Sequence, residues 1–417
     1  MIGAMVVGGC LYGVGVQMRY RYRIEPTPAQ QKKLNRIFGC CRVVFNDAVR
    51  LRQEAHRAGV ALSDTEIQRR VITIAKTTAE RGWLREVPSV ALVQSVNDAR
   101  RAFRNFFDST AGKRRGRKVG PPRFKRKKTN RQSFRLTRNG FRIRPNGRLE
   151  IAKIGGVAVR WSRELPSEPS SVTIIREPDG HYYATFVVEV SNIALPTTER
   201  EVGVDLGITR LASVADTSGG CVDVGNPRYL QRKSRRLARL QREMSRRRKG
   251  SKNRDKARRK VAIQHGRVAR SRRDHHHKEA LTLVRENQVI YVEDLNIAGM
   301  VCNRSLGRAI SDAGWSQFVR IIGEKCDRYG RTLHRVSRWL ASSKTCSDCG
   351  HVLDELALRT RAWQCPACCA VHDRDHNAAK NILAAGRAER LIAGGALVSP
   401  PTREARGDEA GSTSTAA

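Results

Sequence analysis

The chain contains 417 residues, of which 40% are hydrophobic, enough for about two to four compact units with a sizeable core. The 80 Lys and Arg residues outnumber the 39 Asp and Glu residues, which gives a net charge of +41 and a pI of about 11.0. So many cations repel one another unless a polyanion neutralises them, which favours a nucleic acid partner, while 6% aromatic residues argue against binding single strands by stacking alone.

Cysteine content and hydropathy indicate the cellular compartment in which the protein is expected. Eleven cysteines, four of them clustered late in the chain, are typical of a reduced intracellular protein with a metal site rather than of a disulfide framework. No run of about eighteen or more apolar residues follows the first segment, so the sequence predicts no membrane span there. We therefore expect a cytoplasmic, nucleoid-associated protein.

The amino terminus differs in composition from the rest of the chain. Residues 1–17 carry no charge and contain five glycines, and they lack the basic start of a signal peptide. We expect translation to begin at Met18, with residues 1–17 as an over-extended gene start. The following RYRYRI alternates basic with apolar or aromatic residues, which predicts a half-buried strand that ends at Pro26.

Helical periodicity dominates the next segment. Apolar stripes predict helices from Ala29, over Asp64–Ala79 and over Val90–Phe107, most simply as core elements. Lys113–Lys128 then contains ten Lys or Arg in sixteen residues and no acid, with a GPPRF turn inside. A solvated loop is the plain interpretation, but this density favours contact with phosphates. The candidate nucleic-acid-binding residues here are Arg114, Arg115, Arg117, Lys118, Arg123, Lys125 and Arg126.

A β-rich region leads to the first acidic candidate. Gln132–Val190 contains short alternating segments separated by NG, GG and DG turns, which predicts several strands. The apolar run Val202–Ile208 then reads as a buried strand that carries Asp205 to its end and turns at Gly207. Taken alone, Asp205 is as well explained as an ordinary turn residue.

The segment Arg228–Lys278 is strongly basic, with 22 Lys or Arg against three acids. Leu237, Leu240 and Met244 give it a thin apolar stripe, and Lys249–Asn253 interrupts the helical pattern. Because the segment lies between two strand-borne acids, we expect a basic helix pair along a nucleic-acid channel, with contacts from Arg246, Arg247, Arg248 and Lys249. The three histidines that follow Asp274 are expected at the surface or facing nucleic acid.

Further acids follow later strands and turns. VIYV at Val289–Val292 runs directly into Glu293 and Asp294, and HDRDHNAAKNIL contains Asp373 and Asp375. Singly, Glu293 could be a surface charge and Asp375 the N-cap of a helix over Asn377–Leu383. Three carboxylates on separate elements could instead converge on a divalent cation. Oxygen ligands suit magnesium, and paired magnesium ions are the usual device for attack at a phosphodiester.

Between these acids lie a helix and a cysteine motif. Asp312–Gly330 predicts an amphipathic core helix. Four cysteines form two CxxC pairs fifteen residues apart, the spacing of a four-thiolate zinc ribbon: Cys346, Cys349, Cys365 and Cys368. A closed thiolate set leaves no open position for a substrate, so the zinc is expected to be structural, with Cys369 as a spare. Beyond about Ala385 the composition turns to small and polar residues and predicts a disordered tail.

From Met18 to about Leu383 the chain closely resembles the transposon-encoded OrfB, or TnpB, family, compact relatives of type V CRISPR effectors. The matching blocks include RYRIEPTPAQ, GPPRFKRKKTNRQSFRLT, DGHYYATFVVEV, VGVDLGI, VEDLNIAGM, SSKTCSDCG and CPACCAVHDRDHNAAKNIL. The resemblance implies an α+β multidomain fold: a split N-terminal β-barrel with an inserted helical lobe, then a RuvC, ribonuclease-H-like α/β nuclease domain with an inserted zinc ribbon.

The corresponding boundaries are expectations of the same kind. Residues 18–48 and 113–198 would form the wedge-like β-barrel, and 49–112 the helical recognition lobe. Residues 199–343 and 371–390 would form the nuclease domain, with 228–278 as its basic helical segment. Residues 344–370 would form the zinc ribbon, and 391–417 the disordered tail.

The resemblance also implies a function. It predicts a monomeric RNA-guided DNA endonuclease whose guide RNA comes from the transposon end and whose target is double-stranded DNA. By motif match the catalytic, magnesium-binding set is Asp205, Glu293 and Asp375, whereas Asp294 and Asp373 fall outside it. The departures are Cys369, where the family usually has glycine, and DHHHK at Asp274–Lys278, where a Phe-Leu-His run is usual.

Two other functions remain open from the sequence. A non-cutting nucleic-acid-binding regulator of the same fold would have no need to gather three acids beside phosphates, and their presence argues against it. A transposase that performs strand transfer would need the same carboxylates, so the motifs do not exclude it. Dependence of cutting on a guide RNA separates these alternatives from the main hypothesis.

Overall fold

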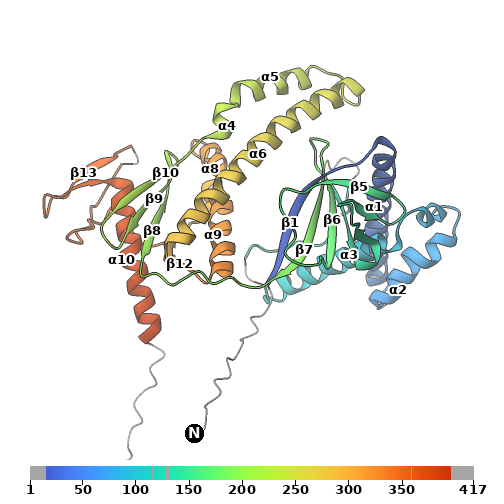
Figure 1. Cartoon of the computed structure of the whole chain (residues 1–417), viewed down its shortest axis with the longest axis horizontal. Helices are drawn as coiled ribbons and strands as arrows, with labels where there is room; N and C mark the ends of the chain where they lie inside the picture. Colours follow the sequence, from blue (N-terminus) through green and yellow to red (C-terminus); the bar gives the residue numbers. More distant parts are fainter. Residues whose placement is uncertain (1–15, 115, 127–130, 358, 396–417) are drawn as a thin grey trace, which may run out of the picture. The chain divides into compact units, whose positions relative to one another are not determined.

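A computed structural model of the chain describes residues 16–114, 116–126, 131–357 and 359–395 (Figure 1). The contacts divide it into two units, residues 1–192 with 232–270 and residues 193–231 with 271–417. Several sequence predictions lie partly outside the described residues: the extension up to residue 15, residues 115, 127 and 128 of the basic segment, residue 358 of the expected ribbon, and the tail from residue 396. No helix of the described part is both long and apolar enough to cross a membrane.

Unit 1 is built on a seven-stranded antiparallel sheet with the order β2-β6-β7-β1-β5-β4-β3. Its two edge strands are joined by a short turn at Arg138–Gly140, so the sheet curls into a nearly closed barrel. The strands, in chain order, are β1 (Val16–Glu25), β2 (Gln132–Thr137), β3 (Phe141–Ile143), β4 (Leu149–Ile151), β5 (Gly155–Arg160), β6 (Ser171–Arg176) and β7 (Tyr182–Val190). β2–β7 lie in the predicted β region Gln132–Val190, and β1 is the strand predicted from the RYRYRI alternation. β1 begins two residues before Met18, with Val16 opposite Val190.

Two long helices complete the core of unit 1. α1 (Pro28–Arg57) begins with a capping box between Thr27 and Gln30, and α3 (Ser89–Thr110) packs on both α1 and β2. The buried faces of both helices share one hydrophobic core with the sheet. The boundary predicted between residues 48 and 49 therefore falls inside α1, and the helices are not a lobe with a core of their own.

The helix predicted over Asp64–Ala79 is broken into shorter pieces. α2 (Asp64–Gln68) gives way to a π-helical turn at Arg69–Ile74 and a 3₁₀ turn at Ala75–Thr77. A further 3₁₀ turn covers Gly82–Glu86. The Val-Ile-Thr-Ile run within this segment is β-branched, and β-branching disfavours regular α-helix.

The basic segment forms a helical hairpin, most of which belongs to unit 1. α4 (Tyr229–Arg232) is short, whereas α5 (Ser234–Ser245) and α6 (Lys252–Glu286) are joined by the predicted break. The Arg254 guanidinium donates to the carbonyls of Met244 and Arg247, 3.0 Å away in each case, which closes the hairpin. Residues 232–270 group with unit 1 rather than with the nuclease domain to which the sequence assigned them, and buried Asp179 of unit 1 binds Arg270 at 2.8 Å.

Unit 2 contains a five-stranded sheet with the order β10-β9-β8-β11-β12. The first three strands run antiparallel to one another, and β11 and β12 run parallel to β8. Their bounds are β8 (Glu201–Leu206), β9 (Arg210–Asp216), β10 (Cys221–Gly225), β11 (Val289–Glu293) and β12 (Thr332–Val336). β8 and β11 are the predicted acid-bearing strands, whereas β9, β10 and β12 were not predicted.

Helices cover both faces of this sheet (Figure 1). α10 (Arg374–Gly395) packs on β8 and β9, while the C-terminal part of α6 and α9 (Trp315–Tyr329) bury the opposite face. α10 includes residues 391–395, where the sequence predicted the start of a disordered tail. The remaining elements are α7 (Ile297–Met300), α8 (Gly307–Ala313) and the hairpin β13 (Ala362–Gln364) and β14 (Val371–Asp373). Gly314, with φ of 70°, separates α8 from α9 within the single helix predicted there.

Candidate functional site

Strand register brings two of the predicted catalytic acids side by side. β8 and β11 are parallel, with Val204 opposite Val292, so Asp205 and Glu293 occupy the next position on each strand. Side chains two residues apart share a face of a sheet. On β8 that face is marked by Gly203, where the Ala379 carbonyl of α10 leaves no room for a Cβ. Asp205 and Glu293 therefore both face α10.

The third acid comes from the first turn of α10. The pKa of Asp205 is raised to about 7, first by burial and then by the negative charges of Glu293 and Asp375. Burial also raises the pKa of Glu293, although the Ser342 hydroxyl donates a hydrogen bond to that carboxylate. Three acids from separate elements thus lie near enough for the charges of Glu293 and Asp375 to act on Asp205. Such a set favours a bound cation, and its oxygen donors fit magnesium.

Asp223 and Ser213, which the sequence analysis did not single out, extend this acidic site. Asp223 on β10 lies opposite Ser213 on β9, which lies opposite Asp205, so these side chains form a row across the sheet. Asp223 accepts hydrogen bonds from Ser213 and from His376 of α10, each at 3.0 Å. Their signal was the alternation of apolar and polar residues after Gly207, which marks β9 and β10.

Arg210 places a positive charge within this row. Its Nε lies 3.0 Å from Asp223, and its Nη1 lies 3.2 Å from Asp373 and 4.0 Å from Asp375. Arg361, from the β13–β14 hairpin, lies 3.5 Å from the other oxygen of Asp375. Asp375 is therefore held between two guanidinium groups, whereas the charges next to Asp205 are largely negative.

Asp373 and Asp294, which were predicted to lie outside the catalytic set, both have protein partners. Asp373 Oδ1 accepts the backbone N–H of Asp375 at 3.0 Å and of His376 at 3.1 Å, so it caps α10. Burial alone would raise the pKa of Asp373, but the His376 N–H and Arg210 lower it below its ordinary value. Asp294 pairs with Arg338 and, at 3.8 Å, with Arg335.

These contacts predict different costs for removing the two acids. Asp373→Ala is expected to lower the free energy of unfolding by about 1 to 2 kcal/mol, because it leaves two N–H groups of α10 without an acceptor. Asp294→Ala removes only two exposed ion pairs and is expected to cost less than about 1 kcal/mol. Denaturant unfolding of the two variants measures this difference. Equal stability of both would contradict the capping role.

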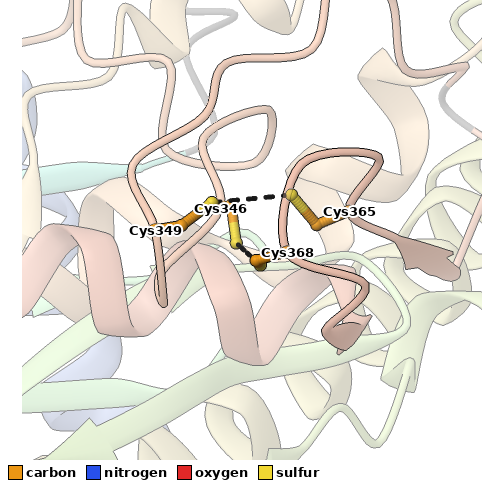
Figure 2. Close-up of side chains that lie close together, drawn as sticks. All are labelled: Cys346, Cys349, Cys365 and Cys368. Atoms are coloured by element: carbon orange, nitrogen blue, oxygen red, sulfur yellow. Dashed lines mark hydrogen bonds between the residues drawn. The ribbon is translucent and has the colours of Figure 1, made fainter.

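The four predicted zinc ligands come together as the spacing requires. The sulfur atoms of Cys346, Cys349, Cys365 and Cys368 all lie within 4.8 Å of one another, on two knuckles that face each other (Figure 2). Within the described ranges, no other set of three or more His, Cys, Asp or Glu brings its ligand atoms so close. Four thiolates at this spacing fit a structural zinc ion. The ten described cysteines are free of disulfides.

Three residues that the motif analysis did not single out support the knuckles. His372 is buried and its Nε2 lies 3.0 Å from the Cys346 sulfur, a typical outer contact of a thiolate ligand. Asn377 and Asn381, one turn apart on α10, both donate to the carbonyls of Ser342 and Thr345. α10 therefore holds the segment before the first cysteine pair, as well as carrying Asp375.

The predicted nucleic-acid-binding residues lie on two basic surfaces of unit 1. Arg246, Arg247, Arg248 and Lys249 are exposed between α5 and α6. They adjoin a hollow of about 650 Å³ lined by Arg239, Arg242, Glu243, Arg246 and Arg247. Among the residues of the 113–126 loop that the structure describes, the exposed candidates are Arg114, Arg117, Lys118, Arg123, Lys125 and Arg126. Lys125 differs from the others, because its Nζ lies 3.9 Å from the Phe45 ring centre and partial desolvation there lowers its pKa.

The histidine run is not the surface feature that the sequence suggested. His276 is only 1% exposed, donates from Nε2 to the Ala313 carbonyl at 2.9 Å, and packs on Phe318. Burial lowers the pKa of His276 to about 4, so it is a neutral core residue at pH 7. His275 contacts the Gly225 carbonyl. The prediction was wrong for His276 because α6 turns this face towards α8 and α9.

Three family descriptions match the chain. Residues 185–304 match the OrfB family of IS605 type, described as "Probable transposase", and residues 315–382 match the Cas12f1-like TNB domain. Residues 16–60 match a domain described as helix-turn-helix; here they form β1 and the single helix α1.

Known proteins match over almost the whole length. A Streptomyces pristinaespiralis protein named "Putative RNA-guided DNA endonuclease" is 41% identical over 376 residues, which cover 89% of this chain and 90% of that protein. An Escherichia coli (strain K12) protein named "Putative RNA-guided DNA endonuclease InsQ" is 30% identical, with coverage of 91% and 94%. The solved Cas12f1–sgRNA–target DNA complex has a similar fold, with a TM-score of 0.56, 12% identity and coverage of 88% and 98%.

Proposed function

This chain belongs to the OrfB, or TnpB, family of RNA-guided DNA endonucleases, and we propose that it cuts DNA phosphodiester bonds at the acidic site of unit 2. The observation that carries the proposal is the convergence of Asp205, Glu293 and Asp375 on one face of the sheet, at the carboxyl ends of β8 and β11. We assign this sheet and its helices to a RuvC-like, ribonuclease-H-like nuclease domain.

Within this proposal, Asp205, Glu293 and Asp375 hold magnesium. When bound, magnesium supplies activation of water and neutralises charge that develops at the phosphate. The remaining residues orient the ligands: Ser342 fixes the Glu293 carboxylate, and Asp373 fixes the first turn of α10 and with it Asp375. The four cysteines hold a structural zinc ion that keeps the segment carrying Ser342 next to α10.

The proposed partners are a guide RNA made from the transposon end and a double-stranded DNA target, bound by one copy of the chain. Base pairing to a guide supplies the sequence specificity, so the protein itself needs chiefly cationic surfaces that bind backbone phosphates. The exposed arginines around the α5–α6 turn and in the 113–126 loop fit that need.

The α5–α6 turn gives a direct prediction. Replacing Arg246, Arg247, Arg248 and Lys249 by Gln is expected to weaken nucleic-acid binding and to flatten its salt dependence. Each lost phosphate contact removes a slope of roughly 0.7 to 0.9 in a plot of log K against log salt concentration. Binding titrations over a range of salt concentrations measure this slope. If the slope does not change, these cations do not contact phosphates.

Guide dependence tests the function itself. RNA that co-purifies with the protein is sequenced, and the purified complex is then given DNA that matches or does not match that RNA, in the presence of magnesium. Cleavage of the matching DNA alone is expected. Cleavage that ignores the RNA, or transfer of strands without it, would favour a transposase, and binding without any cleavage would favour a regulator.

A further inference from the structure

The segment between β12 and the first cysteine pair touches the acidic site at both of its ends. Val336, the last residue of β12, lies opposite Glu293 in the sheet. Arg338 then pairs with Asp294, and Ser342 donates to Glu293. The 337–342 loop is therefore fastened at two points to the acids that end β11.

This loop holds one large aromatic side chain in solvent. Trp339 is 87% exposed, more than any other large hydrophobic residue that the structure describes. Its neighbour Leu340 packs into the core with Val336 and Tyr291, and the Leu340 N–H bonds the Ser337 carbonyl at 3.2 Å. Because Leu340 is anchored inward and Arg338 is paired, the turn itself directs the indole outward.

The surroundings of Trp339 indicate what could cover it. Arg335 and Arg338 precede Trp339 in the chain; both pair with Asp294, and their side chains remain 51% and 47% exposed. A protein partner would need a matching apolar surface, whereas an unpaired nucleotide brings a flat ring for the indole and a phosphate for the arginines. Bases within a duplex are already stacked on one another, so only an unpaired base offers a free ring face.

From this geometry we propose that Trp339 stacks on an unpaired base of the DNA strand that enters the acidic site, beside the phosphate to be cut. This inference rests on the proposed nuclease function and adds a binding residue to it. The loop that carries Trp339 is itself bound to Glu293 through Ser342. Stacking on Trp339 would therefore hold the nucleotide near Glu293 and so position the DNA strand at the acidic site. Because any base has a ring face, this contact selects single strands rather than a sequence.

The test uses the full chain with its guide RNA and compares Trp339→Ala with Trp339→Phe. Leu391→Ala, which truncates another exposed apolar side chain of unit 2, serves as the matched control. Target DNA carries one abasic nucleotide, moved step by step along the strand to be cut. Wild type is expected to cut about tenfold more slowly at one or two abasic positions. Trp339→Ala is expected to cut intact DNA as slowly as wild type cuts the abasic DNA, with no further loss of rate at those abasic positions. Trp339→Phe is expected to recover most of the wild-type rate on intact DNA.

Direct binding separates this inference from the proposed function. Wild type is expected to bind a short single-stranded DNA about tenfold more tightly than Trp339→Ala does, with quenching of tryptophan fluorescence that Trp339→Phe loses. If wild type cuts guided DNA but Trp339→Ala matches it in binding and at every abasic position, the inference fails while the function stands. If wild type never cuts, the proposed nuclease function is refuted. The comparison of single-stranded DNA binding between wild type and Trp339→Ala still tests whether the indole stacks on a base. A change of sedimentation in Trp339→Ala with unchanged DNA binding would assign the indole to a protein contact and overturn the inference.

Discussion

Asp205→Ala and Glu293→Ala are each expected to abolish guided cleavage in magnesium and to leave guided DNA binding intact. A neutral methyl group cannot take the place of a carboxylate ligand, so at least a thousandfold loss of rate, on the order of 4 kcal/mol of transition-state stabilisation, is expected. Binding should persist or tighten slightly, because the substitution removes a negative charge beside a polyanion. The measurement is a paired binding and cleavage assay on one guided target.

Asp294→Ala is the matched control, since Asp294 adjoins Glu293 but pairs with Arg338 and Arg335. It should retain most of the activity. Asp373→Ala should be intermediate, because loss of the cap displaces Asp375 without removing it. Undiminished cutting by Asp205→Ala would refute the assignment of the metal site. If Asp294→Ala loses as much cutting as Glu293→Ala, the assignment of Glu293 rather than Asp294 as the magnesium ligand is contradicted.

A pH experiment with a third variant, Asp205→Asn, tests the raised pKa of Asp205. The pKa of Asp205 is about 7 in the folded protein and near 3.8 when exposed, so at intermediate pH the folded state holds a proton that the unfolded state has lost. Without metal, stability should therefore fall as pH rises from about 4 to about 7. Asp205→Asn lacks this penalty and should be more stable than wild type at pH 8, by on the order of 2 to 4 kcal/mol, but not at pH 4. Thermal unfolding in magnesium-free buffer, with zinc retained, measures both.

The second large effect concerns the zinc ribbon. Cys346→Ser is expected to reduce bound zinc towards zero and to unfold the region around residues 344–373. A hairpin of two three-residue strands with a core of little more than Cys346, Trp363 and Cys365 is too small to fold unaided. Binding of zinc to four thiolates contributes about 10 kcal/mol or more to the folding of such a module.

Cys369→Ser controls for loss of a thiol from the same hairpin, because Cys369 is exposed and lies outside the cluster of four sulfurs. It should keep one zinc per chain. Elemental analysis and thermal unfolding of both variants decide the case, and a full complement of zinc in Cys346→Ser would refute the site. Cleavage should also fall in Cys346→Ser, because Asn377 and Asn381 then lose the ordered carbonyls of the segment that carries Ser342.

Local patterns in the sequence determined a large part of this protein. Hydrophobic periodicity is a property of neighbouring residues, so it predicted α1, α3 and the strands of unit 1, and the acid-bearing strands β8 and β11. The cluster of four cysteines was equally predictable, because each CxxC pair places two thiols within one turn of backbone. The motif match named Asp205, Glu293 and Asp375, and the register of β8 and β11 explains how two of them meet.

Only the tertiary structure decided the contacts between segments far apart in the chain. Arg210 lies between Asp223 and Asp373 because β9, β10 and α10 meet there, and no spacing in the sequence records that meeting. The acid that caps α10 is Asp373 rather than Asp375, because the helix begins at Arg374 and Asp373 Oδ1 accepts the N–H groups of its first turn. His276 is buried and Trp339 exposed, the reverse of what polarity alone suggests, because the neighbours that cover or free a side chain come from other elements.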